Sequence, residues 1–183
     1  MPLLILLNGP PGCGKSTVAQ MYVDDHPLAL NLDVDMIRRL IGGWKARPQE
    51  SGGLARQIAL EAAAAHLREG HDVVVPQYLG RTDFVEQLEA TAAAAAGEFR
   101  EIVLMTSRDT ALRRFGERSS AAAEPTHVEA EAMARHEGGP DPVGAMYDRL
   151  AARLLSRPGP VVVQAVTGDP VATYQKVLLS LSG

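Results

Sequence analysis

Residues 8–17 of the 183-residue chain, NGPPGCGKST, constrain its fold more than any other stretch. They combine three glycines, two prolines and a lysine, and they follow directly after the apolar run LLILL. Such a short, continuously apolar run is typical of a strand that is covered on both faces. The glycines allow backbone conformations closed to other residues, so successive N–H groups can point inward and form a nest for an anion. The stretch therefore predicts a strand, an anion-binding turn and a helix that begins near Lys15.

Gly9 to Ser16 also fit the pattern G-x-x-x-x-G-K-[ST], which is typical of loops that bind nucleotide phosphates between a strand and a helix. The N-terminus of the helix adds its positive dipole. In this pattern Lys15 bridges the β- and γ-phosphates of ATP, and the Ser16 hydroxyl ligates Mg²⁺. The sequence thus predicts ATP and Mg²⁺ as cofactors. The residues expected to bind the nucleotide here are Gly9, Pro10, Pro11, Gly12, Cys13, Gly14, Lys15, Ser16 and Thr17.

Apolar runs and helical patterns alternate along the rest of the chain. The predicted strands are residues 3–8, 28–33, 71–77, 99–106 and 159–168. The predicted helices are residues 15–25, 36–43, 54–70, 82–96, 109–119, 127–139, 141–157 and 169–182, with 44–53 as a loop. This alternation predicts one α/β domain over residues 1–183, with a parallel sheet of about five strands and helices on both faces. Ligands bind such sheets at the carboxyl ends of the strands.

Composition limits the function classes. A net charge of −4 and an aromatic content of 4% argue against a nucleic-acid-binding surface over the whole domain, although a small basic patch inside one cleft remains open. The single cysteine rules out an internal disulfide framework and suits a reducing compartment. No stretch approaches the roughly 20 apolar residues that span a membrane. We expect a cytoplasmic protein with no membrane partner.

Two carboxylates, Asp33 and Asp35, follow the second predicted strand. In motor-like and switch NTPases an acid ends a neighbouring apolar strand, but here residues 73–75 run into Pro76 and Gln77. Asp33 would instead hold Mg²⁺ through water, while Asp35 orients and deprotonates an attacking hydroxyl. The alternative for either residue is a cap of the next helix.

The segments NGPPGCGKST and NLDVDMIRRLIG resemble the small P-loop kinases with a nucleoside-monophosphate-kinase-type fold. They are similar in particular to the kinase domain of polynucleotide kinase and the small-molecule kinases grouped with it. They are more distantly similar to shikimate kinase, gluconate kinase and chloramphenicol phosphotransferase. The resemblance implies a P-loop NTPase fold of three layers, with Lys15 and Ser16 as phosphate and Mg²⁺ ligands. It also implies Asp35 as general base and Arg38 as a residue that holds the substrate.

The resemblance is specific through about residue 41 and again near 108–118. After its third strand polynucleotide kinase carries Asp-Thr-Asn, whereas this chain reads PQYLGR over residues 76–81. Gln77, Tyr78 and Arg81 would contact the substrate there, but the acid is absent. A 5′-hydroxyl end of a nucleic acid is therefore a weaker candidate for the phosphate acceptor.

Arg114 and Arg118 stand four residues apart on one face of a predicted helix. The resemblance implies a helical lid over about residues 114–140, with one arginine over the phosphates and another against adenine. We assign Arg118 to the phosphates and Arg114 to the base, and the reverse order stays open, as does a solvated basic face. Thr167 and Pro170 would form the adenine slot, while the alternative for this junction is a cap of the last helix.

Residues 36–54 form the predicted substrate-side segment, in which Arg38 suits a carboxylate or phosphate and Trp44 suits stacking on a ring. The sequence predicts an ATP-dependent kinase that transfers the γ-phosphate to a hydroxyl of a small molecule, such as a sugar, a nucleoside or an antibiotic-type natural product. One alternative is a kinase acting on a nucleic-acid 5′-hydroxyl, a nucleoside or a nucleoside monophosphate. Another is a regulatory nucleotide-binding NTPase. The acceptor's identity and the oligomeric state stay open.

Overall fold

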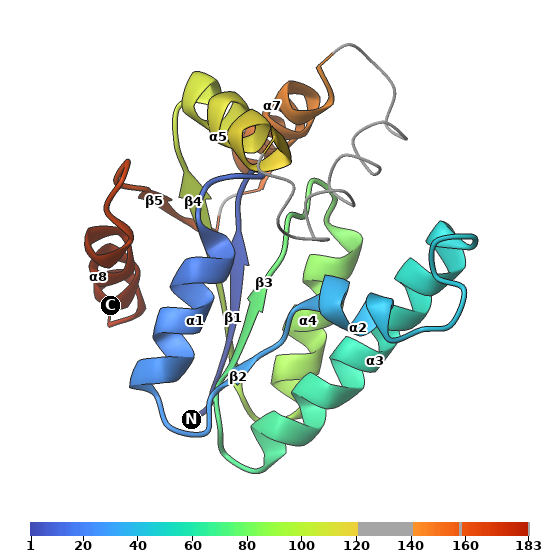
Figure 1. Cartoon of the computed structure of the whole chain (residues 1–183). Helices are drawn as coiled ribbons and strands as arrows, with labels where there is room; N and C mark the ends of the chain where they lie inside the picture. The colour runs from blue at the N-terminus through green and yellow to red at the C-terminus, as the bar shows by residue number, and fades with distance from the viewer. Residues whose placement is uncertain (121–140, 158, 183) are drawn as a thin grey trace.

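The computed structural model describes residues 1–120, 141–157 and 159–182. Within them, five parallel strands form one sheet in the order β2-β3-β1-β4-β5, which confirms the predicted α/β architecture (Figure 1). The strands are β1 (Leu3–Asn8), β2 (Leu30–Asn31), β3 (Val73–Pro76), β4 (Glu98–Met105) and β5 (Val161–Gln164). The helices are α1 (Lys15–Asp25), α2 (Val34–Arg39), α3 (Pro48–Arg68), α4 (Asp83–Ala94), α5 (Arg108–Ser120), α7 (Pro142–Ser156) and α8 (Pro170–Leu181).

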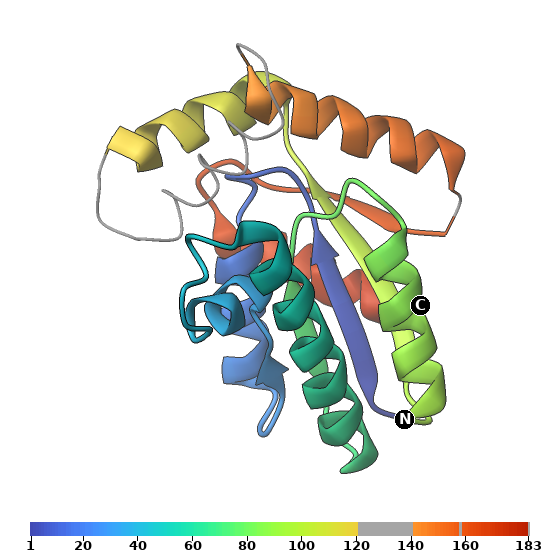
Figure 2. The same ribbon diagram turned by 90° about the vertical axis from the view of Figure 1, so that its right-hand side faces the viewer.

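Helices cover both faces of the sheet (Figures 1 and 2). Along β1, Leu4 and Leu6 pack into the core formed with α3 and α4. Ile5 and Leu7 point the other way, into the core formed with α1 and α8. Because successive residues of a strand face opposite sides, a strand between two helical layers needs apolar residues at every position. This explains the unbroken run LLILL and gives the three layers that the sequence predicts.

Helices α5 and α7 cross above the carboxyl ends of the strands (Figure 2). The Arg108 guanidinium donates to the Asp141 carboxylate at 2.6 Å and pairs with Asp148 at 3.5 Å, which joins the two helices. Asp141 also caps α7 by accepting from the backbone N–H of Gly144 at 2.8 Å. The Gly144 N–H and the Arg108 guanidinium hold the pKa of the Asp141 carboxyl below its usual range. These contacts hold α5 and α7 together over the carboxyl edge of the sheet.

Some element boundaries differ from the predicted ones. The prediction of a loop over residues 44–53 is wrong in its second half, because α3 begins at Pro48. Ser51 and the two following glycines weaken helix propensity, but the Ser51 hydroxyl is buried, donates to the Arg47 carbonyl at 2.7 Å and accepts from Arg38 Nε at 3.2 Å. This packing outweighs propensity, and the helix begins six residues earlier than predicted.

The second strand is shorter than predicted. Leu28 has a φ of 70°, which breaks the extended conformation before Leu30, and Asp33, two residues after the strand ends, is the N-cap of α2. The predicted helix over 127–139 and most of the predicted lid lie outside the described residues. Within the described part of the chain, every helix is too short or too polar to cross a membrane.

Candidate active site

The turn between β1 and α1 presents free backbone donors at the carboxyl edge of the sheet. Gly14 precedes α1 with a φ of 99°, and no side chain caps this helix. In the described part of the chain, no hydrogen bond engages the backbone N–H groups of Gly14, Lys15 or Ser16. The Lys15 ammonium donates to the carbonyls of Gly9 at 2.8 Å and Pro10 at 3.0 Å. The turn thus offers a ring of N–H donors and a cation held in place beside them, as phosphate binding requires.

Close packing at Gly9 and Gly12 leaves little space for a side chain, whereas the space around Gly14 is open. A Cβ at Gly12, whose φ is 84°, would lie 3.2 Å from the Ala111 carbonyl and 3.3 Å from Cβ of Arg114 on α5. Cys13 is 2% exposed and fills the core under α1, so its side chain packs as a small apolar residue. The turn is therefore held between the sheet and α5 in one conformation.

A cavity of about 340 Å³ lies on the α8 side of this turn. Arg114 and Pro170 line it, together with Gly14 and Thr17 of the turn. Thr167 does not line it, although its neighbours Val166 and Gly168 do. Asp169 caps α8 through a bond from the Ala172 N–H at 2.9 Å, with Pro170 as the first helical residue. The β5–α8 junction thus both caps α8 and lines one wall of the cavity. The cavity extends away from the phosphate turn, in the direction expected for the sugar and base of a bound nucleotide.

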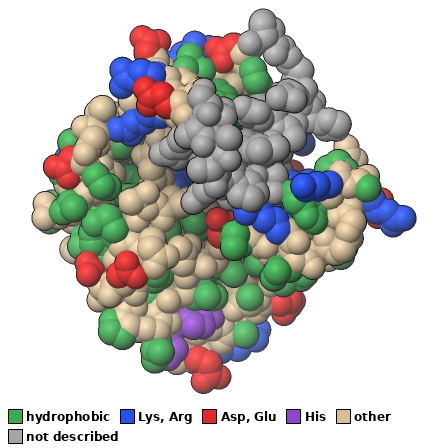
Figure 3. Space-filling model, in the orientation of Figure 1, with side chains coloured by type: hydrophobic (Ala, Val, Ile, Leu, Met, Phe, Trp, Pro, Cys, Tyr) green, Lys and Arg blue, Asp and Glu red, His purple; other side chains and the backbone are tan. Residues whose placement is uncertain are grey.

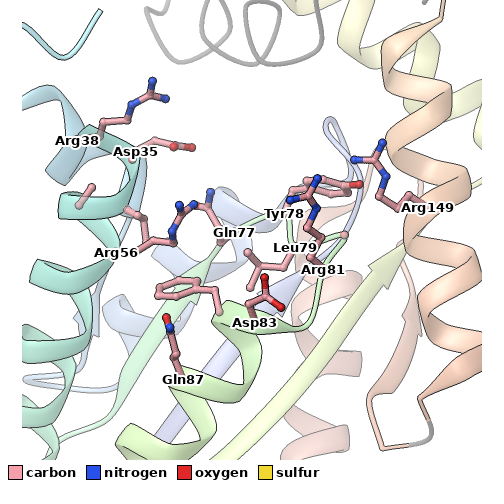
Figure 4. A pocket seen from close by; sticks show the side chains of 15 residues that line it. Asp35, Arg38, Arg56, Gln77, Tyr78, Leu79, Arg81, Asp83, Gln87 and Arg149 are labelled. Atoms are coloured by element: carbon pink, nitrogen blue, oxygen red, sulfur yellow. The ribbon is translucent and has the colours of Figure 1, made fainter. Parts of the chain in front are cut away.

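A second cavity, of about 520 Å³, opens on the other side of the site. Figure 4 shows side chains from several separate segments projecting toward it. On one wall lie Asp35 and Arg56, and on the other lie Arg81 and Arg149, with Gln77 between the walls. The volume suits a metabolite-sized ligand, and the polar lining suits one rich in hydrogen-bonding groups.

Asp35 and the phosphate turn lie at the same edge of the sheet. Each follows the carboxyl end of a strand, and β1 and β2 are parallel strands of one sheet. Asp33 caps α2: its Oδ1 accepts from the backbone N–H groups of Asp35 at 2.9 Å and Met36 at 3.3 Å. Asp35, in the first turn of α2, is half-buried and lines the larger cavity. The two carboxylates therefore have different surroundings, and only Asp35 lines that cavity.

Arg38 and Trp44 pack against each other. Arg38 is 5% exposed, and its guanidinium donates to Ser51 Oγ at 3.2 Å and to the Pro48 carbonyl at 3.1 Å. The Arg38 guanidinium carbon lies 5.4 Å from the centre of the Trp44 ring, and the Lys45 ammonium lies 5.3 Å from the same centre. Arg38 lines the larger cavity, whereas Trp44 does not. These contacts tie α2 to the start of α3.

Of the other predicted substrate contacts, Gln77, Tyr78 and Arg81 all line the larger cavity. The Tyr78 hydroxyl donates to the Met146 carbonyl of α7 at 2.9 Å, so it also fixes that helix to the wall. The Gln77 Oε1 atom is buried and accepts no hydrogen bond from the described residues.

A buried polar network connects the phosphate turn to the wall of the larger cavity. Asn8 is fully buried, and its Oδ1 accepts from the N–H of Gly9 at 2.8 Å and of Leu79 at 2.9 Å. Its Nδ2 donates to the Leu79 carbonyl and to Glu101 Oε1, both at 3.1 Å. The Glu101 carboxylate pairs in turn with the buried Arg153 of α7. All four hydrogen-bonding positions of the Asn8 amide are used, so the side chain fixes both loops relative to each other.

The residues around the turn fit Mg²⁺ as a P-loop binds it. Ser16 lies in the first turn of α1, is exposed, and its hydroxyl has no partner within the described residues. Within the same residues, no group of three or more His, Cys, Asp or Glu side chains could hold a metal by itself. A hard cation bound by one hydroxyl, by phosphate oxygens and by water needs no such group. Ser16 would hold the ion, which would neutralise charge on the phosphates.

Sequence reasoning missed several residues that the fold brings to the site. Arg118 was predicted from the sequence; it lies in the last turn of α5, and its side chain is outside the described part of the structure. The wall residues Arg56, Asp83, Gln87 and Arg149 lie on elements whose contacts with the site depend on the tertiary fold. Asn8, by contrast, stands directly before the glycine turn, and its polar side chain at the end of an apolar strand was an available signal.

A backbone nest between a strand and a helix at the carboxyl edge of a parallel sheet, with one cavity lined by the turn and a second at the same edge, defines the chain as a P-loop protein. The model of a family described as an AAA domain matches residues 4–138. The chain belongs to this family. No curated protein matches it significantly in sequence.

Solved structures share the fold over nearly the whole length of both chains. The tunicamycin resistance protein of Deinococcus radiodurans superposes with a TM-score of 0.66 at 18% identity, covering 99% of this chain and 96% of that one. The Mycobacterium tuberculosis APS kinase CysC in complex with AMPPNP and APS gives 0.67 at 20% identity, with coverages of 100% and 98%. A gluconokinase from Sinorhizobium meliloti gives 0.59 at 14% identity, with coverages of 99% and 91%. At these identities the likeness shows the fold alone.

Proposed function

We propose that the protein transfers the γ-phosphate of ATP to a hydroxyl group of a small molecule. The observation that carries this proposal is that two cavities open at the carboxyl edge of one sheet, one lined by the phosphate turn and the other by Asp35. The smaller cavity continues from the turn toward α8, and the larger one contains Asp35. A kinase needs this arrangement, because donor and acceptor must approach the transferred phosphoryl group from opposite sides.

On the nucleotide side, the backbone N–H groups of Gly14, Lys15 and Ser16 would bind phosphate oxygens, and the Lys15 ammonium would turn from the Gly9 and Pro10 carbonyls to the β- and γ-phosphates. Arg114 would lie against the base, and Arg118 is the residue we propose over the phosphates. Mg²⁺ would supply charge neutralisation at the phosphates, held by the Ser16 hydroxyl.

On the acceptor side, Asp35 would accept a hydrogen bond from the attacking hydroxyl, orient it and take its proton as the bond to phosphorus forms. Asp33 would act mainly through its cap, which fixes the first turn of α2 and hence the Asp35 backbone. Its Oδ2 remains for a water-mediated contact with Mg²⁺. With one buried cysteine and with ATP as phosphate donor, the setting we propose is the cytoplasm.

The face of the molecule in Figure 3 supports a small acceptor over a nucleic-acid end. There, basic and acidic side chains of the described residues are intermingled and form no continuous basic surface. A nucleic-acid-binding groove would need such a surface to neutralise successive phosphates. The neighbouring gluconokinase and APS kinase are named for small acceptors, which is consistent with this choice.

Release of ADP tests the proposal directly. The protein with ATP and Mg²⁺ should release ADP slowly alone and at least tenfold faster with one or more members of a panel of sugars, sugar acids, nucleosides and nucleotides. A 5′-hydroxyl oligonucleotide should give no acceleration. If the oligonucleotide alone accelerates release, the acceptor is a nucleic-acid end. If ATP binds and is hydrolysed at a rate that no compound changes, the protein is a regulatory NTPase.

A further inference from the structure

The larger cavity has an excess of positive charge in a protein that is acidic as a whole. Four arginines line it, against two carboxylates: Arg38, Arg56, Arg81, Arg149, Asp35 and Asp83. The whole chain carries a net charge of −4. The acceptor cavity is therefore a local concentration of guanidinium groups on an otherwise negative molecule, and such a field favours an anionic ligand.

Two of these arginines have no partner in the described part of the chain. Arg38 already donates to Ser51 and Pro48, which leaves its guanidinium partly satisfied. By contrast, no hydrogen bond or ion pair among the described residues engages the guanidinium of Arg56 or Arg81. Planar guanidinium groups bind carboxylate, phosphate and sulfate oxygens in forked geometry, so an unengaged pair is suited to an oxyanion.

The positions of the two side chains suit a common ligand. Arg56 projects from α3 on the wall that also carries Asp35, and Arg81 projects from the loop after β3 on the opposite wall (Figure 4). The Gln77 side chain lies between the walls, with an unpaired Oε1. A ligand that spans the cavity would meet a guanidinium on each side.

We infer that the acceptor is an anionic hydroxyl compound, whose carboxylate, phosphate or sulfate group is bound by Arg56 and Arg81 while its hydroxyl faces Asp35. This inference rests on the proposed kinase function, because it assigns the larger cavity to the acceptor. The two arginines would bind and orient the acceptor and would take no part in the phosphoryl transfer itself.

Anion binding tests the inference before the acceptor is known. The protein is first saturated with AMPPNP and Mg²⁺, so that the phosphate turn is filled, and then titrated by calorimetry with sulfate, inorganic phosphate, acetate and neutral glycerol. At least one anion should bind saturably, and glycerol should not. Arg56→Gln and Arg81→Gln should each weaken that binding about tenfold or more and leave AMPPNP affinity unchanged. The anion that binds most tightly identifies the type of group.

Arg68→Gln is the matched control. Arg68 lies on the same helix as Arg56 and is exposed, but it is 12 residues away, or about 18 Å along the helix axis. It makes the same change in net charge and should bind the anion as the unmodified protein does. If AMPPNP binds but no anion does, or if Arg68→Gln weakens binding as much as Arg56→Gln, the inference is wrong and the kinase proposal stands. If AMPPNP itself does not bind, the kinase proposal fails first.

Discussion

The two ends of the site are built in different ways. The nucleotide end uses backbone groups of one short segment, in which glycine conformation and close packing against α5 determine where each N–H points. The acceptor end uses side chains from α2, α3, the β3–α4 loop, α4 and α7, each positioned by the fold as a whole. Backbone recognition is hard to alter without altering the loop, whereas side-chain recognition changes with single substitutions.

This difference suits the chemistry proposed for each end. Every kinase of this class meets the same phosphates, so a fixed cradle serves all of them. Acceptors differ in shape and charge, and walls made from side chains of several helices and a loop can vary while the fold is kept. Substitutions at the nucleotide end should therefore abolish function, and those at the acceptor end should change selectivity and rate.

The largest expected effect comes from Lys15→Ala. It removes the one cation that the turn itself supplies to the phosphates, so ATP affinity should fall by at least about a hundredfold and turnover by about a thousandfold or more. Calorimetric titration with ATP and ADP-release assays measure both quantities. Lys176→Ala, which changes an exposed lysine on α8, should leave both unchanged. Equal ATP affinity in the Lys15 variant would contradict the assigned cradle.

Asp35→Asn should lower turnover without lowering the affinity for ATP. The amide keeps the shape but cannot take the proton, so turnover should fall about a hundredfold or more while ATP affinity stays within about twofold. Asp33→Asn is the matched control, because asparagine also caps a helix well. It should preserve the melting temperature and at least a tenth of the turnover. An Asp35 variant that turns over at a near-normal rate would remove this residue from the base role.

The difference between backbone and side-chain recognition also explains how much of the site could be predicted from sequence. The phosphate turn is a contiguous pattern with local consequences, so Gly9 to Thr17, both flanking elements and the edge of the sheet follow from a few residues. Arg56 and Arg149 are 93 positions apart, and nothing local marks either as part of one wall. The start of α3 was misread for a related reason: Ser51, Gly52 and Gly53 read as a break in the helix, but the Arg38–Ser51 contact stabilises it.

Asn8 connects the two ends and allows their independence to be tested. Asn8→Ala removes bonds to Gly9, Leu79 and Glu101 together, so both loops should lose their fixed positions. We expect kcat to fall about tenfold and KM to rise for ATP and acceptor alike, because misplaced reacting groups lower the rate even when each still binds. Kinetics with each substrate varied in turn measure these values.

Tyr22→Phe is the control that separates the positioning role of Asn8 from a general loss of stability. It removes a partly buried hydrogen bond, from the Tyr22 hydroxyl to Asp72 at 2.7 Å, at the amino edge of the sheet. The melting temperature should fall in both variants, but only the Asn8 variant should change kcat and both KM values at a temperature where both are folded. Unchanged kinetics for Asn8→Ala would mean that the two ends work independently.

The smallest effect is expected at Trp44. Its ring supports the guanidinium of Arg38 and the Lys45 ammonium but does not line the larger cavity. Trp44→Leu should cost about 0.5–1 kcal/mol of stability through the lost cation–π contact and change the KM for the acceptor less than about threefold. Thermal unfolding and acceptor titration measure the two effects. A tenfold rise in that KM would instead place the indole against the acceptor, which would extend the substrate-side surface beyond the cavity to the α2–α3 loop and make the acceptor end broader than its walls indicate.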